Sequence, residues 1–285
     1  MSRRMRTYYY AVVGAIGGLI AWRISDLLGL SFTGSLTFNE LVIGGLIGLS
    51  IGLLIGVAEG IVTLDARRML RTAIVAAPLG LAAGAVGLVL GEAAFQVLGG
   101  ESLGRVLGWA LFGVMIGLAE STSGRTQMWK GALGGLVGGA VGGVLIELAR
   151  RGYADPVLGK AVGLVLLGAA VGTFIALISV LLSRAWFEVA SGKLKGAEFV
   201  LDKFLPDGGP AAIIGSDALK ADIALPDPDI APQHALLRGA GSHVTLKDLS
   251  LTGTFVENRR IQVAALADRQ RIRLGNTELI YHERR

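Results

Sequence analysis

The sequence predicts a protein of two parts, an all-α polytopic transmembrane bundle of about six helices followed by a small all-β domain. Of the 285 residues, 52% are hydrophobic and only 17% are charged. A water-soluble globule of this size needs a larger charged surface. Long apolar stretches also fill the chain before residue 190 and give way to short, strand-like segments after it. The lipid bilayer is therefore the first partner that we expect.

Composition excludes several classes of function. The chain has no cysteine, which excludes disulfides, thiolate metal sites and cysteine nucleophiles. Its net charge is +5, but the basic residues lie mostly at the edges of apolar segments, where membrane orientation accounts for them. Nucleic-acid binding is therefore not expected. No cluster of residues predicts a metal site, a cofactor or an enzyme.

Six apolar stretches are long enough to cross a bilayer, which takes about 20 helical residues. Sustained period-two alternation, which a membrane β-barrel would need, is not visible. The predicted helices are Tyr8–Ser25, Leu41–Ile61, Thr72–Leu98, Val106–Ser121, Trp129–Ala149 and Leu158–Leu182.

The Lys and Arg residues of the connections predict the orientation. One side carries Arg3, Arg4, Arg6, Arg67, Arg68, Arg71, Arg125, Lys130, Arg184, Lys193 and Lys195. The other carries Arg105, Arg150, Arg151 and Lys160. Because basic loops stay in the cytoplasm, we expect a multi-pass protein of the cell (inner) membrane with both termini cytoplasmic.

The apolar region looks internally repeated. Gly52–Glu59 reads GLLIGVAE, Gly113–Glu120 reads GVMIGLAE, and Gly168–Thr173 reads GAAVGT. Each segment belongs to an even-numbered helix, so three tandem helical hairpins of roughly 60 residues would explain the pattern.

Glycines recur at every third or fourth position of these helices. Such stripes allow two helix backbones to approach closely, and the alternative is that they line a pore. Stripes that faced lipid would attract helices of another copy, so we also expect a homo-oligomer.

Five acidic residues belong to the predicted helices or their ends. Glu59 and Glu120 are expected near the cytoplasmic face, and Asp26, Glu92 and Glu147 toward the opposite face. Acids in membranes often mark ion or proton routes, but acids near helix ends are readily hydrated. Both interpretations apply, and Glu92 lies deepest by sequence.

The composition changes after residue 189. We expect residues 1–189 to form the membrane domain, 190–196 a hydrated linker, and 197–285 a β-sandwich. The predicted strands are Glu198–Phe204, Ala211–Ile214, Asp222–Leu225, His234–Arg238, Val244–Lys247, Thr254–Glu257, Arg271–Leu274 and Glu278–Tyr281.

Five motifs of this last segment occur in a recognisable order. They are Ile214-Gly215, Asp222–Leu225, Ile230–Ala235, Leu246–Val256 and Ile272–Gly275. In order and spacing they resemble the forkhead-associated (FHA) family. The resemblance implies an antiparallel β-sandwich that binds phosphothreonine peptides through loops at one end.

The residues that bind the phosphate and the peptide backbone in that family are largely replaced. Ser216 stands where the family has an Arg that pairs with the dianion, Ala231 stands where it has a Ser, Pro232 where it has an Arg, and Thr252 where it has an Asn. The family residues that are retained, Gly215, His234, Gly253 and Thr254, are architectural. The resemblance therefore predicts the fold without phosphothreonine recognition.

Three bases on neighbouring loops, Lys220, Arg259 and Arg260, could replace the missing cation or could be solvated surface charges. His234 has no Ser, Cys or carboxylate at a spacing typical of catalysis, so we expect a structural role for it.

Two functions fit these observations. The first is a non-enzymatic membrane scaffold or assembly component whose FHA-like domain binds a cytoplasmic protein, or another copy, without phosphate. The alternative is a channel or transporter subunit regulated by the FHA-like domain, which would depend on the hairpin repeat and on Glu92.

Overall fold

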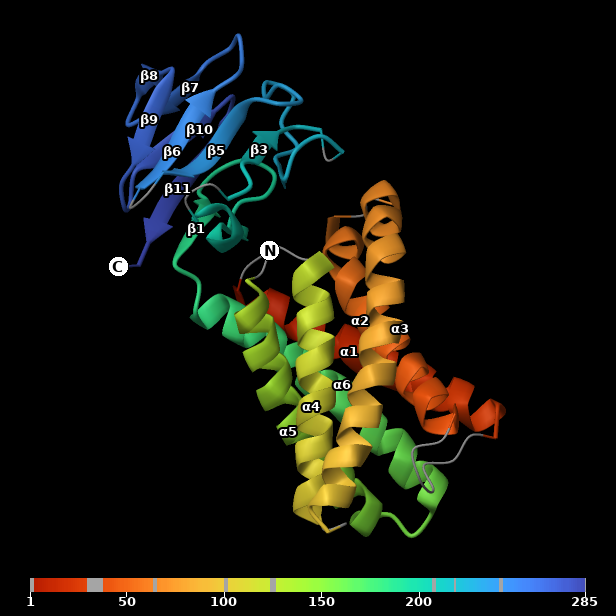
Figure 1. Cartoon of the computed structure of the whole chain (residues 1–285). Coiled ribbons are helices and arrows are strands. Elements are labelled where there is room, and N and C mark those ends of the chain that lie inside the picture. The colour runs from red at the N-terminus through yellow and green to blue at the C-terminus, as the bar shows by residue number, and fades with distance from the viewer. Residues whose placement is uncertain are drawn as a thin grey trace. The chain divides into compact units, whose positions relative to one another are not determined.

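A computed structural model describes residues 3–29, 38–63, 66–99, 102–123, 127–206, 209–217, 219–240 and 243–284. They form two compact units, a helical unit from Arg4 to Leu181 and a β unit that begins at Leu182 (Figure 1). The predicted all-α bundle followed by an all-β sandwich is confirmed.

The helical unit contains the six predicted helices. They are α1 (Arg3–Leu27), α2 (Phe38–Thr63), α3 (Ala66–Val97), α4 (Ser102–Ser123), α5 (Met128–Gly152) and α6 (Pro156–Leu181). Five of them are long and apolar enough to cross a membrane, and α2 contains a shorter apolar segment, Leu41–Val57. The described part of the chain therefore fits a membrane-spanning bundle by length and composition.

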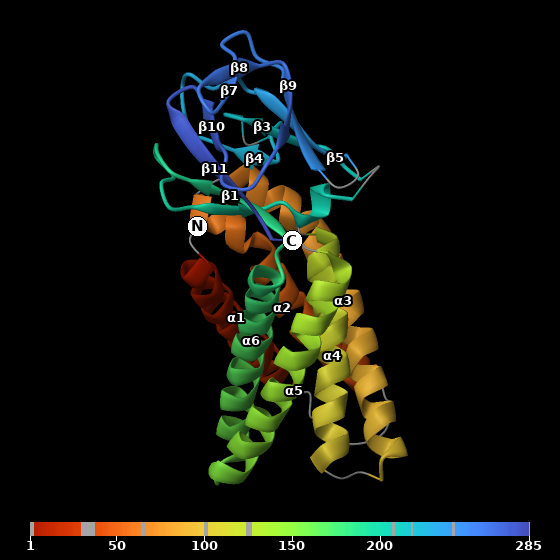
Figure 2. The same cartoon turned by 90° about the vertical axis from the view of Figure 1, so that its left-hand side faces the viewer.

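The helices pack in a closed ring, because each of α2 to α5 packs against the next helix along the chain and α1 packs against α2 through Gly17 and Ile51. Figure 2 shows α3, α4, α5 and α6 running beside one another. The ring closes because α1 packs against α6, with Gly14 opposite Gly168 and Gly18 opposite Leu164. A Cβ added at Gly168 would overlap the carbonyl oxygen of Gly14. Only glycine permits this approach of the two backbones.

Several glycine contacts recur in the order that the predicted three-hairpin repeat implies. An even-numbered helix places a glycine against a glycine of the next odd-numbered helix: Gly48 meets Gly80, Gly113 meets Gly135, and Gly168 meets Gly14. Within each hairpin, an odd-numbered helix places a glycine against a large residue of its partner: Gly17 meets Ile51, Gly87 meets Phe112, and Gly138 meets Val171. These stripes pack inside the chain, so an oligomer would need a different surface.

The centre of the helical unit is filled with apolar side chains. Ile43, Ile47, Ile51 and Ile55 recur at every fourth position of α2 and are fully buried. Phe112 and Ile116 of α4 and Leu167 and Val171 of α6 are also fully buried, in the same cluster. Among the described residues, this cluster forms a packed core.

The β unit is a sandwich of two sheets. One sheet has the order β2-β1-β11-β10-β7-β8 and the other the order β4-β3-β5-β6-β9. The strands are β1 (Ala185–Val189), β2 (Glu198–Val200), β3 (Ala212–Gly215), β4 (Ile223–Ala224), β5 (Ala235–Ala240), β6 (His243–Asp248), β7 (Thr254–Val256), β8 (Arg259–Ile261), β9 (Val263–Leu266), β10 (Arg271–Leu274) and β11 (Thr277–Glu283).

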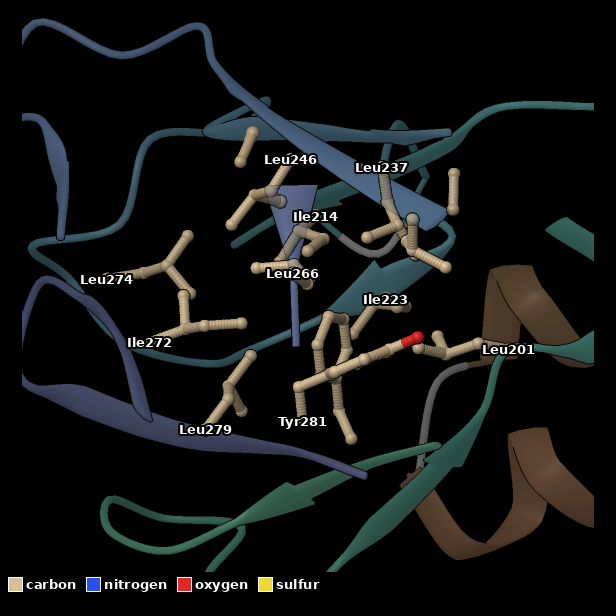
Figure 3. Close-up of a cluster of buried hydrophobic side chains, with 14 of the residues drawn as sticks. Leu201, Ile214, Ile223, Leu237, Leu246, Leu266, Ile272, Leu274, Leu279 and Tyr281 are labelled. Atoms are coloured by element: carbon tan, nitrogen blue, oxygen red, sulfur yellow. The ribbon is translucent and has the colours of Figure 1, made fainter. Parts of the chain in front are cut away.

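A hydrophobic core lies between the two sheets (Figure 3). Ile214, Leu237 and Leu246 come from one sheet and Ile272 and Tyr281 from the other, and each is fully buried. Alternate side chains of the strands supply this core, and the intervening side chains are more exposed. Burial raises the pKa of the Tyr281 phenol well above its usual value, so the ring stays neutral.

The sandwich begins earlier than we predicted. Strand β1 pairs antiparallel with β11 along its whole length, from Ala185 opposite Glu283 to Val189 opposite Leu279. Residues 190–196 therefore connect β1 to β2 and are not a linker between domains, so the predicted boundary at residue 189 was wrong. Burial alternates along Ala185–Val189, but Glu188 is the one polar residue of this segment. The sequence therefore shows no alternation that would separate the strand from the apolar end of α6 directly before it.

Strands β8 and β9 were not predicted either. β8 forms the edge of its sheet beside β7, and β9 forms the edge of the other sheet beside β6. Their side chains are mostly exposed. An edge strand with little burial has no clear hydrophobic alternation, which is the signal that reveals a strand in a sequence.

Candidate functional site in the loops of the sandwich

Several loops converge at one end of the sandwich, which we call the loop end. The register places Ile214 of β3 opposite Ala235 of β5, and Ala235 opposite Asp248 of β6. The β3–β4, β4–β5 and β6–β7 loops therefore leave the sheets at the same edge. The chain enters β1 at the opposite edge, where Ala185 pairs with Glu283.

His234 is buried at the base of the loop end with no exposed surface. Its Nδ1 accepts a hydrogen bond from the backbone N–H of Ala231 at 3.1 Å. That contact places the ring proton on Nε2, which faces the carbonyl oxygen of Gly253 at 3.3 Å and the hydroxyl of Ser250 at 3.1 Å. Burial lowers the pKa of His234, although the Gly253 carbonyl and the charges of Asp248 and Asp227 oppose this shift.

Ser250 connects His234 to Asp248. Its hydroxyl donates to Oδ1 of Asp248 at 2.8 Å and accepts a hydrogen bond from the Gly253 N–H at 2.9 Å. The same Oδ1 accepts the Thr254 hydroxyl at 2.9 Å and the Ser250 N–H at 3.1 Å. Burial works to raise the pKa of Asp248, but these hydrogen bonds together outweigh it and the pKa is lowered.

The structure thus brings a serine and a carboxylate to His234, although we expected no such partners. The order of contacts differs from that of a catalytic triad, because Asp248 accepts from the serine and not from the histidine. Nε2 of His234 carries the proton and cannot accept one from Ser250. The network ties the β4–β5 and β6–β7 loops together.

Gly215 and Ser216 lie beside the β4–β5 loop. A Cβ at Gly215 would overlap the carbonyl oxygen of Pro232, so the loop packs directly on the glycine backbone. The backbone N–H of Ser216 donates to the carbonyl oxygen of Ala231 at 3.0 Å. Ser216 and Ala231, two of the positions at which the resemblance implies phosphate ligands, are therefore neighbours here. Their side chains are a short hydroxyl and a methyl group.

The three candidate bases lie at different places. Arg260 lies at the loop end, where its Nη2 donates to the carbonyl oxygen of Leu251 at 3.2 Å. Its guanidinium covers Gly253, whose φ of +89° favours glycine. Lys220 is exposed in the β3–β4 loop, whereas Arg259 pairs with Val256 beside the β7–β8 turn, away from the loop end. Only Arg260 is thus shown in contact with the retained Gly253.

Exposed apolar side chains are found at the same end. Leu251, at the tip of the β6–β7 loop next to the exposed Thr252, is 98% exposed, and Leu249 is 46% exposed. Leu219 of the β3–β4 loop and Val263 at the start of β9 are also exposed. Neighbouring exposed apolar side chains on a rigid base are typical of protein-binding surfaces.

Asp227 holds the β4–β5 loop against the β10–β11 turn. Its carboxylate accepts hydrogen bonds from the N–H of Asp229 at 3.0 Å, the N–H of Asn276 at 3.0 Å and the hydroxyl of Thr277 at 2.9 Å. Burial opposes ionisation, but the hydrogen bonds together outweigh it and the pKa of Asp227 is lowered. Sequence reasoning identified neither Asp227 nor Ser250 as a site residue, although both lie in Asp- and Ser-containing turns.

The acids of the helical unit are dispersed. Asp26 pairs with Arg23 at 3.3 Å, and Glu147 pairs with Arg151 at 2.9 Å. Glu120 is buried near the end of α4 and accepts the Tyr10 hydroxyl at 3.4 Å. Glu92 is half-buried on α3 and accepts from the Gln96 amide at 3.0 Å. The side chain of Glu59 lies outside the described residues.

These positions do not form one path through the bundle. Asp26, Glu92 and Glu147 lie near the C-terminal ends of odd-numbered helices. Glu120 lies near the C-terminal end of α4, which is at the other end of the bundle. The packed apolar cluster lies between the two ends. Among the described residues, no group of three or more His, Asp or Glu side chains could hold a metal ion.

The C-terminal part of the chain is similar to known proteins. Residues 188–284 match a family described as the inner membrane component of T3SS (the type III secretion system), cytoplasmic domain. An ABC transporter ATP-binding/permease protein of Mycobacterium tuberculosis is 37% identical over 71 residues, which make up 25% of this chain. The chain spans only 8% of the length of that curated relative.

Solved structures match a similar share of this chain. The FHA domain of a Chlamydia trachomatis protein is 35% identical, with 36% of this chain and 100% of that chain covered and a TM-score of 0.33. The cytoplasmic domain of the T3SS sorting platform protein PscD from P. aeruginosa is 22% identical, with 35% and 80% covered and a TM-score of 0.31. The β unit is an FHA domain, as the order of its motifs predicted.

Proposed function

We propose that this chain is a non-enzymatic scaffold or assembly component of the cell (inner) membrane. The helical unit anchors it in the bilayer, both termini are cytoplasmic, and the loop end of the FHA domain binds a cytoplasmic protein without requiring phosphate. The proposal depends on two features of the loop end. Ser216 and Ala231 stand in place of the phosphate ligands, and the side chain of Leu251 is 98% exposed.

First, the position after Gly215 carries no cation, because Ser216 stands there. Phosphate dianions are held by guanidinium groups through paired, charge-assisted hydrogen bonds. Ser216 supplies no such charge, and the guanidinium of Arg260 is already bonded to the Leu251 carbonyl. A phosphopeptide would thus gain little from the phosphate itself.

The second step is the apolar character of the loop tip. Leu251 and Leu249 extend from a loop whose base is held by Ser250 and Asp248. Apolar side chains on a preorganised loop can be buried in a partner with little loss of conformational entropy. Arg260 beside them favours a partner surface that combines an apolar pocket with acidic groups.

The third step is the membrane location. Five helices of the described chain are apolar and long enough to span a bilayer, and the basic connections favour cytoplasmic termini. The matched family, an inner membrane component with a cytoplasmic domain, agrees with this arrangement. A membrane anchor raises the local concentration of the FHA domain at the membrane surface, which suits an assembly component.

Photo-crosslinking in the full chain, in membranes of the cell that makes it, tests the proposal. A crosslinking residue at position 251 should capture a defined protein in equal yield before and after phosphatase treatment. The matched control is position 269, where Arg269 is exposed in the β9–β10 turn at the opposite edge. Loss of the crosslink after phosphatase treatment would reject phosphate independence, and capture only at position 269 would reject the loop end as the binding surface.

A further inference from the structure

A cavity of about 480 Å³ lies within the helical unit, between α3, α4, α5 and α6. Its wall includes residues of the α5–α6 connection, Tyr153 and Ala154. The helices alternate in direction, so the cavity lies at the end of the bundle where α3 joins α4 and α5 joins α6. In a membrane-spanning bundle, this end lies at the boundary between hydrocarbon and headgroups.

The cavity wall is partly charged and partly apolar. Three cations, Arg105, Arg150 and Lys160, line it together with one acid, Glu92. Leu88, Ile146 and Leu164 supply apolar wall, and the rings of Phe95 and Trp109 also face the cavity. A wall that combines an apolar surface with an excess of positive charge suits a ligand that is itself part alkyl chain and part anion.

Arg105 has hydrogen-bonding capacity that the described residues do not use. Its Nε lies 3.5 Å from Oε2 of Glu147, and this buried nitrogen makes no hydrogen bond to any described residue. Glu147 is also held by Arg151 at 2.9 Å, so its charge is shared between two cations. The guanidinium of Arg105 stacks over the ring of Phe95, with its carbon 5.2 Å from the ring centroid, which fixes it at the cavity wall.

We infer that this cavity binds the phosphate headgroup of an anionic phospholipid, with Arg105 and Arg150 at the phosphate and an alkyl chain along Leu88, Ile146 and Leu164. Arg105 is held at the cavity wall by Phe95 and Glu147. Its side chain is partly exposed, so the exposed part of the guanidinium can pair with a phosphate oxygen. The apolar wall favours a lipid over a free anion, because a small anion would leave that wall in contact with water. The inference does not depend on the proposed scaffold function.

Native mass spectrometry of the full chain in detergent provides the test. Dioleoylphosphatidylglycerol and dioleoylphosphatidylcholine have the same chains and differ in headgroup charge, so their retention reports the headgroup preference. We expect the wild-type chain to retain the phosphatidylglycerol about tenfold better. The Arg105→Gln/Arg150→Gln variant should lose this preference.

Two controls keep the test decisive. Arg23→Gln removes an exposed cation at the same end of the bundle but outside the cavity, and its lipid preference should match that of the wild type. Arg150→Gln alone changes an exposed side chain, so it should weaken the preference without lowering the melting temperature. The inference would be overturned if Arg150→Gln and Arg105→Gln/Arg150→Gln both kept the wild-type lipid preference. It would also be overturned if Arg23→Gln lost as much of the preference as these two variants.

A further arm distinguishes the lipid from a free anion. Inorganic phosphate at millimolar concentration should not displace the bound phosphatidylglycerol, because it lacks the chain that contacts the apolar wall. Displacement by inorganic phosphate, together with retention of phosphate on the chain, would show an anion site and overturn the lipid assignment.

Discussion

Ser250 and His234 lie 16 residues apart in the chain, yet the Ser250 hydroxyl lies 3.1 Å from Nε2 of the buried imidazole. This contact joins the loop that carries Leu251 to the loop that carries Ala231. One hydroxyl thereby serves three groups, because it also accepts from the Gly253 N–H and donates to Asp248.

Ser250→Ala should destabilise the FHA domain by about 1–3 kcal/mol, because it leaves the Gly253 N–H without its acceptor and removes one donor from Asp248. Urea titration of the full chain with pulse proteolysis, read from the FHA-domain fragments, measures the change. Ser216→Ala is the matched control, since Ser216 contributes its backbone N–H to the loop contact. Equal stability of the two variants would show that the Ser250 network does not hold the loop end.

The stability of the FHA domain should fall in acid. The folded pKa of His234 is lowered, so below the unfolded value of 6.5 the unfolded chain binds the proton more readily. This contribution is full above pH 6.5 and is lost as the pH falls from there toward the folded pKa. His234→Asn should remove this part of the pH dependence in the same urea titration.

A second loss is expected at lower pH. The folded pKa values of Asp227 and Asp248 lie below the usual 3.8, so their contribution is present above pH 3.8 and disappears as the pH falls through the folded values. Asp227→Asn should flatten this lower part of the curve while leaving the part near pH 6 in place. A curve that stays flat from pH 7 to pH 3 would contradict both assignments.

Gly168→Ala should destabilise the helical unit, by about 1–3 kcal/mol if the backbones shift as in other overpacked cores. The added methyl would overlap the Gly14 carbonyl and force α1 away from α6. Gly152→Ala adds the same methyl at the end of α5, where nothing lies within 4 Å. Melting in detergent should therefore separate the two variants, and equal melting temperatures would show that α1 and α6 do not pack as described.

Liposomes that contain the protein should hold a potassium gradient as well as empty liposomes do. Ile47, Ile51, Phe112 and Val171 fill the centre of the bundle, and a packed apolar core presents a high barrier to a hydrated ion. A potassium-sensitive dye measures the leak. A flux above the empty control that Glu92→Gln changes would instead support the transport hypothesis.

Much of the helical unit was predictable because its signals are local. Apolar length identifies a spanning helix, and the recurrence of GLLIGVAE as GVMIGLAE indicates the repeat within the sequence itself. Which glycine meets which was not predictable, because the contact of Gly14 with Gly168 depends on how a ring of six helices closes. The cavity beside Arg105 likewise depends on how α3, α4, α5 and α6 pack together.

The sequence likewise predicted only some features of the FHA domain. The order of its motifs predicted the sandwich, which the structure confirms. That Ser216 and Ala231 replace phosphate ligands stays a prediction from the same motifs. The start of the sandwich at Ala185 was missed, because β1 becomes a strand only when β11, almost 100 residues later in the chain, pairs with it. Ser250 was missed as a partner of His234 for a related reason, since its hydroxyl meets the imidazole through the folding of the β6–β7 loop and not along a strand.

By itself, the sequence determined that the chain divides into an apolar part, with helices long enough to cross a bilayer, and a β-sandwich, because hydropathy and ordered motifs are properties of the chain read along its length. The tertiary structure alone decided which backbones touch, which loops share a hydrogen-bond network and where three cations border a cavity. Those features depend on groups distant in the chain that meet only when the ring and the sandwich close.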